Sequence, residues 1–126
     1  MSETYETPPH LPREVAHAQL REGDKRSRID ALLSLAIYDP DWRSAQELSL
    51  QHLHDPDVDL IATAVLGLAH IARRQQDLDI ERVIPELERL RSDPRLAGRV
   101  DDALDDIRIY VRGATQQSDE DPGLGD

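Results

Sequence analysis

Three Asp-Pro dipeptides divide this chain of 126 residues into short apolar segments that have the spacing of helices. The dipeptides begin at Asp39, Asp55 and Asp93. Proline disfavours helical backbone in the residue before it and cannot continue a helix itself, so each dipeptide marks a helix boundary. Between the boundaries, apolar residues recur every three or four positions, which is the period of an amphipathic helix. The sequence therefore predicts an all-α fold of five or six helices.

Helix-start and helix-stop residues place these helices along the chain. The predicted helices run from Pro12 to Gly23, from Asp24 to Asp39, and over about 42–54, 57–74, 80–91 and 95–112. Ser44 and Glu47 have the spacing of a capping box for the third helix, and Asp79 is the expected cap of the fifth. The fourth helix is apolar almost all round, so we expect it at the centre of the fold. Trp42 is predicted to anchor in the core.

The segments that follow the second and third dipeptides resemble each other at an offset of 38 residues. The aligned pairs are Val58 with Leu96, Ala62 with Val100, Val65 with Ala103, Leu66 with Leu104, and Ile71 with Ile109. A period near 40 residues with two helices in each repeat is typical of an α-solenoid. One helical hairpin cannot bury its own apolar face, so we expect about three hairpins to stack.

The two ends of the chain differ in composition from the helical segments. Residues 1–11 contain Pro8 and Pro9 and show no periodicity, which predicts a flexible arm. Residues 113–126 carry four acidic residues and no basic residue, which predicts a disordered acidic tail. The predicted helical repeat domain is 12–112.

The charge of the chain limits its partners. Fifteen basic and 26 acidic residues give a net charge of −11 at pH 7. Binding of nucleic acid needs a basic surface, as does docking on anionic lipid, so neither is expected. Cysteine is absent, which excludes disulfides and thiolate chemistry. No apolar stretch resembles a signal peptide or approaches the ~20 residues of a membrane span, so the expected location is the cytoplasm.

An acidic quartet in the sixth predicted helix is the most unusual feature of the sequence. It consists of Asp101, Asp102, Asp105 and Asp106, and like charges four residues apart on a helix cost a few tenths of a kcal/mol. In one interpretation, the quartet is a carboxylate patch for a basic partner. In the other, some of its members form ion pairs with arginines between helices. A divalent metal site is the least favoured interpretation.

His70 and Arg73 lie in the fourth predicted helix, and the repeat offset places them beside the quartet. We expect both to be polar residues between helices, with His70 held by an aspartate of the last helix. His52 and His54 are two residues apart, which is a poor spacing for joint metal binding on a helix. No nucleophile motif or phosphate-binding loop is found, so no catalytic residue, cofactor or metal is expected.

Several stretches resemble HEAT repeats. The segment Val83-Ile84-Pro85-Glu86-Leu87 resembles the proline-bent first helix, and Asp55-Pro56-Asp57-Val58 the start of the second. The stretches 66–73 and 98–107 are similar to small bacterial HEAT-like proteins, some of which resemble immunity proteins of polymorphic toxin and contact-dependent inhibition systems. The resemblance covers about 28–112. The chain departs from the pattern at Asp59, where arginine is frequent, and at residues 74–76, where Arg-Gln-Gln replaces Ile-His-Gly.

The resemblance implies a short HEAT-like α-solenoid that binds and neutralises a basic toxin domain and catalyses no reaction. On this hypothesis the quartet is the partner-binding patch. Two other functions remain open: a HEAT-like scaffold or adaptor, and an accessory lyase. A DNA glycosylase of HEAT-like fold would need a basic groove, which a net charge of −11 disfavours.

Overall fold

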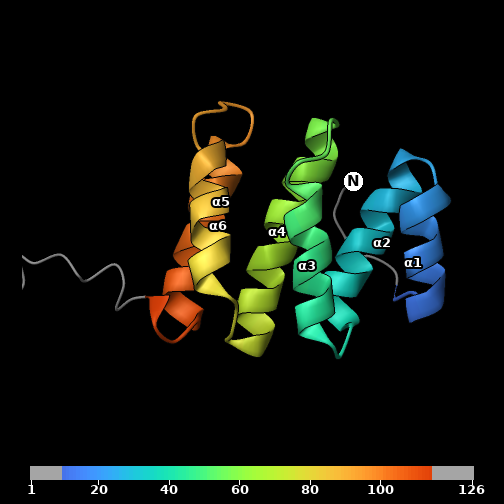
Figure 1. Ribbon diagram of the computed structural model, residues 1–126, viewed down its shortest axis with the longest axis horizontal. Coiled ribbons are helices and arrows are strands. Elements are labelled where there is room, and N and C mark those ends of the chain that lie inside the picture. Colours follow the sequence, from blue (N-terminus) through green and yellow to red (C-terminus); the bar gives the residue numbers. More distant parts are fainter. Residues whose placement is uncertain (1–9, 115–126) are drawn as a thin grey trace, which may run out of the picture.

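The computed structural model describes residues 10–114, and this part of the chain forms six helices and no strand (Figure 1). The helices are α1 (Arg13–Glu22), α2 (Lys25–Tyr38), α3 (Trp42–His52), α4 (Val58–Gln75), α5 (Ile80–Leu90) and α6 (Ala97–Tyr110). The prediction of an all-α fold is confirmed. The predicted arm and tail lie outside the described residues, except for His10, Leu11, Gly113 and Ala114.

Consecutive helices pair as hairpins, and the hairpins stand side by side in a row (Figure 1). The second helices of the hairpins, α2, α4 and α6, pack closely on one another. By contrast, the first helices, α1, α3 and α5, make only slight contact with each other within residues 10–114. As its apolar sequence predicts, α4 is the central element, because it packs against α2, α3 and α6.

The core is aliphatic, and Gly67 allows the helices around α4 to approach closely. Fully buried side chains from α4 include Leu60, Val65, Leu68 and Ile71. A Cβ atom at Gly67 would lie 3.1 Å from Ser49 Oγ in α3 and 3.3 Å from the Ala36 Cβ in α2. Each buried leucine contributes about 1.5–3 kcal/mol, so the apolar sides of α4 provide much of the stability.

All three Asp-Pro dipeptides form the same turn. The aspartate carboxylate accepts a hydrogen bond from the backbone N–H two residues later, beyond the proline that has no N–H of its own. The N···O distances are 2.9 Å for Asp39, 2.8 Å for Asp55 and 2.9 Å for Asp93. An arginine from an earlier helix also reaches two of these carboxylates: Arg13 Nε lies 3.2 Å from Asp39, and Arg28 lies 3.0 Å from Asp55. The first turn joins two hairpins, and each of the other two joins the helices of one hairpin. The Arg28–Asp55 pair links the first hairpin to the second.

The predicted capping box at the start of α3 is wrong. The cap is Asp41, whose carboxylate accepts a hydrogen bond of 3.2 Å from the backbone N–H of Ser44. Because Asp41 precedes the first helical residue directly, Ser44 lies inside the first turn and cannot be the cap. The side chain of Glu47 points away from the helix start and pairs with Arg82 of α5.

Two large apolar side chains are exposed. Val15 of α1 is 43% exposed, and Ile109 of α6 is 71% exposed. The repeat alignment equates Ile109 with Ile71, which is 1% exposed because further helices cover α4 on both sides. No fourth hairpin follows α6 within the described residues, so the equivalent side of α6 is open.

Two buried serines provide a matched test of the packing. The hydroxyl of Ser49 is buried without a hydrogen-bond partner in the part of the chain described, whereas Ser34 Oγ accepts a 3.0 Å bond from the Leu11 N–H. An unpaired buried polar group costs about 1–3 kcal/mol. We therefore expect Ser49→Ala to raise the free energy of unfolding by about 1 kcal/mol and Ser34→Ala to lower it by a similar amount. Urea denaturation of both variants measures this, and a loss of stability in Ser49→Ala would contradict the assignment.

Candidate functional site

An ion pair joins the acidic quartet of α6 to α4. Arg73 Nη1 lies 2.5 Å from Asp106 Oδ2, and Arg73 Nη2 lies 2.9 Å from His70 Nδ1. The three side chains thus form a chain across the contact between the second helices of two neighbouring hairpins. Both partners of the ion pair are partly shielded from water, with exposed fractions of 35% for the Arg73 side chain and 24% for that of Asp106.

His70 contacts Arg73, not an aspartate as we expected. The Arg73 guanidinium binds both His70 and Asp106, so it connects these two side chains. Burial lowers the pKa of His70 below its usual range, and the positive charge of Arg73 lowers the pKa further. A neutral His70 can accept the Arg73 hydrogen bond at Nδ1, which a protonated ring cannot do.

The other three members of the quartet lie on the exposed surface of α6. Asp101 pairs with Arg91 at 3.0 Å, across the connection between α5 and α6. Asp105 pairs with Arg108 on its own helix at 3.2 Å. Asp102 makes no ion pair with another described residue and lines a hollow of about 250 Å³ between α4 and α6. The quartet therefore divides into one carboxylate that links helices and three that face solvent.

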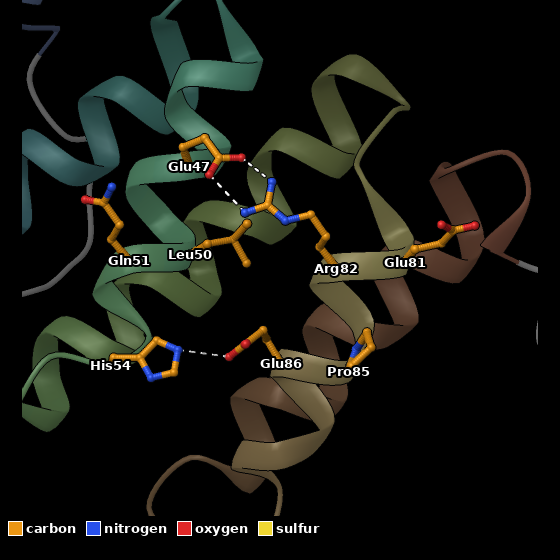
Figure 2. A pocket seen from close by; sticks show the side chains of 8 residues that line it. All are labelled: Glu47, Leu50, Gln51, His54, Glu81, Arg82, Pro85 and Glu86. Atoms are coloured by element: carbon orange, nitrogen blue, oxygen red, sulfur yellow. Dashed lines mark hydrogen bonds and ion pairs between the residues drawn. The ribbon is translucent and has the colours of Figure 1, made fainter.

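A larger hollow lies between α3 and α5, a location that the sequence did not predict. Its volume is about 450 Å³, and two polar bridges cross it (Figure 2). Arg82 of α5 binds Glu47 of α3 through both carboxylate oxygens, at 2.5 and 3.0 Å. One turn further along α5, Glu86 lies 3.1 Å from His54 Nε2. Leu50 lies between the two bridges (Figure 2).

Neighbouring arginines stabilise the ionised forms of both glutamates. Hydrogen bonds from Arg82 lower the pKa of Glu47. A hydrogen bond from Arg89 is the main cause of the lowered pKa of Glu86. Both carboxylates are therefore ionised at neutral pH and can accept further hydrogen bonds from a cation.

A second hollow continues the first toward the start of α3. It measures about 390 Å³ and shares Glu47 and Arg82 with its neighbour. Trp42 lines it, half-buried rather than fully anchored in the core, with the Arg43 guanidinium 4.4 Å from the ring centroid. One weak signal of this region is visible in the sequence: Pro85 interrupts the hydrogen bonding of α5 beside the larger hollow.

Within residues 10–114, no group of three or more His, Cys, Asp or Glu side chains is placed to hold a metal ion.

In the same part of the chain, none of the helices has the length and apolar character to cross a bilayer.

Comparison with known proteins identifies a relative of this chain. No protein-family model matches the sequence, and the curated proteins give no match. A chain in the crystal structure of a CDI complex from Cupriavidus taiwanensis LMG 19424 has 32% sequence identity with this chain and a TM-score of 0.78. The match covers 86% of this chain and 98% of that chain. This chain therefore belongs to the same family as that component of the CDI complex.

Two aspartates of α6 test the division of the quartet. Asp106→Asn removes the charge that binds Arg73 between helices, and we expect the free energy of unfolding to fall by about 1 kcal/mol or more. Asp105→Asn removes an exposed pair within one helix, and we expect a change below about 0.5 kcal/mol. Guanidinium denaturation distinguishes these values, and equal losses would refute a special structural role for Asp106.

The lowered pKa of His70 predicts a loss of stability in acid. An unfolded histidine titrates near its ordinary pKa of about 6.5, so below that pH the unfolded chain binds a proton that the folded chain resists. The free energy of unfolding should therefore fall as the pH decreases from about 7 toward the lowered pKa. His70→Gln should show a shallower decrease over this window. Denaturation curves at several pH values give the free energy of unfolding of the wild type and of His70→Gln as a function of pH. An identical pH dependence in the two proteins would contradict the prediction.

Proposed function

We propose that this chain is an immunity-type protein that binds and neutralises a cognate bacterial toxin and catalyses no reaction itself. The supporting observation is its similarity to nearly the whole length of a chain found in a CDI complex. In a contact-dependent inhibition system, such a complex pairs a toxin domain with its inhibitor. The proposed site of action is the cytoplasm, where an inhibitor meets a toxin that has entered the cell.

The charge of the chain favours the role of inhibitor over that of toxin. A toxin that cuts nucleic acid needs a basic surface, whereas this chain has a net charge of −11 and a pI near 4.7. An acidic inhibitor is complementary to such a toxin. The arrangement of the second helices, stacked from hairpin to hairpin, supports a short HEAT-like repeat as the scaffold.

The proposed role of the acidic quartet is to attract the basic partner. Asp101, Asp102 and Asp105 are exposed, and charges at the edge of an interface act mainly by accelerating association. Asp106 has a different proposed role, because its carboxylate is bound to Arg73. The net charge of the chain adds to the same attraction at long range.

Growth protection and binding kinetics test the function. The probe is the toxin domain encoded by the reading frame directly upstream of this chain's gene. We expect co-expression of the chain to restore growth of cells that produce this domain, and we expect the purified pair to bind with an affinity that falls as salt increases. Absence of both protection and binding would refute the proposed function.

A triple variant, Asp101→Asn with Asp102→Asn and Asp105→Asn, tests the attraction. We expect its association rate to fall by about tenfold at low salt, with little change in the dissociation rate. The matched control removes three exposed carboxylates elsewhere, by Glu14→Gln, Glu22→Gln and Glu88→Gln. An equal decrease in both variants would attribute the attraction to net charge alone and not to the quartet.

A further inference from the structure

The row of hairpins leaves a groove along one side. Because the hairpins pack mainly through their second helices, α3 and α5 stand apart, and the two adjoining hollows of about 450 and 390 Å³ lie between them. Glu47 and Arg82 line both hollows, so the hollows adjoin each other on either side of the bridge that these two residues form. We use "α3–α5 groove" for this surface.

Carboxylates outnumber cations along the α3–α5 groove. The acidic lining residues are Glu47, Asp77, Asp79, Glu81 and Glu86, whereas the arginines are Arg43 and Arg82. A backbone acceptor adds to this excess. Pro85 has no N–H, so the carbonyl of Glu81 lacks the hydrogen-bond donor that it would normally find four residues later in a helix. The α3–α5 groove is therefore rich in acceptors for a cationic donor.

The groove already holds one guanidinium. Arg82 spans it and binds both oxygens of Glu47 in the bidentate geometry that a carboxylate and a guanidinium prefer (Figure 2). Beyond this bridge, Glu86 points from α5 toward His54 (Figure 2), and its Oε1 lies 3.1 Å from His54 and 3.0 Å from Arg89. Gln51 of α3 also lines the hollow. Leu50 and Pro85 provide apolar surface for the methylene groups of a long side chain.

We propose that the α3–α5 groove is where the toxin docks, and that it receives an arginine side chain of the toxin between Glu86 and the Glu81 carbonyl. This inference rests on the proposed function and assigns it a surface. A basic partner is the occupant that fits an acceptor-rich groove on an acidic chain. Trp42, at the far end of the groove, provides the kind of aromatic residue that is enriched among energetically dominant interface residues.

The groove and the quartet have separate roles in this account. Three of the four quartet carboxylates bind arginines of this chain, at Arg73, Arg91 and Arg108. The groove glutamates Glu47 and Glu86 likewise bind arginines of this chain. Exposed charges mainly change the association rate, whereas groups that become buried in an interface mainly change the dissociation rate. The kinetic constants therefore separate attraction by the quartet from docking in the groove.

The experiment compares two double variants that have the same net charge. Glu81→Gln with Glu86→Gln removes two carboxylates from the groove, and Glu14→Gln with Glu22→Gln removes two exposed carboxylates from α1. The full-length proteins bind the upstream-encoded toxin domain on a sensor surface. We expect the groove variant to dissociate about tenfold faster or more, and the α1 variant to change by less than about twofold.

A second pair of variants keeps the test valid if the carboxylate changes disturb α5. Gln51→Arg places a cation in the groove from an exposed position on α3, and Val15→Arg places the same residue on exposed α1. Circular dichroism verifies that both fold. We expect Gln51→Arg to weaken binding about tenfold or more, and Val15→Arg to bind as the wild type does or at most about twofold more weakly.

The outcomes distinguish the two proposals. If the wild type binds the toxin domain and both groove variants bind equally well, the docking surface is elsewhere and the proposed function stands. If the wild type does not bind the domain, the proposed function fails, and the docking inference fails with it.

Discussion

The repeated Asp-Pro turn is the constraint on which the rest of the structure depends. In each turn the proline cannot continue the preceding helix, and the aspartate carboxylate accepts a hydrogen bond from the backbone N–H two residues later. All three carboxylates also bind an arginine: Asp39 binds Arg13, Asp55 binds Arg28 and Asp93 binds Arg95. The turns therefore separate α2 from α3, α3 from α4, and α5 from α6. The Arg28–Asp55 pair also links the first hairpin to the second, beside the stacked second helices.

Stacking through the second helices has consequences for the whole surface. It buries α4 on several sides, brings Arg73 to Asp106, and leaves α3 and α5 apart. The aliphatic contacts stabilise the fold, and ion pairs between hairpins neutralise some of the carboxylates. The charge that remains lies on exposed α6 and along the α3–α5 groove, and both positions are suited to a basic protein partner.

The sequence predicted the helices and most of the core, because periodicity and helix-stop residues report local structure. The predictions from the sequence failed where the burial or the partner of a residue depends on helices that are distant in the sequence. Ile109 fits the repeat pattern yet is exposed, since no helical pair covers that side of α6 within the described residues. Glu47 has the spacing of a capping residue, but an arginine 35 positions away in sequence binds it instead. The α3–α5 groove was missed for the same reason, because it is formed by two helices that barely touch.

The structure of a complex between this chain and the toxin domain encoded upstream tests the central claim most directly. The account predicts that the toxin occupies the α3–α5 groove, with a basic side chain beside Glu86. A complex in which the toxin docks on another surface and leaves the groove open, or a toxin domain that forms no complex at all, would contradict it.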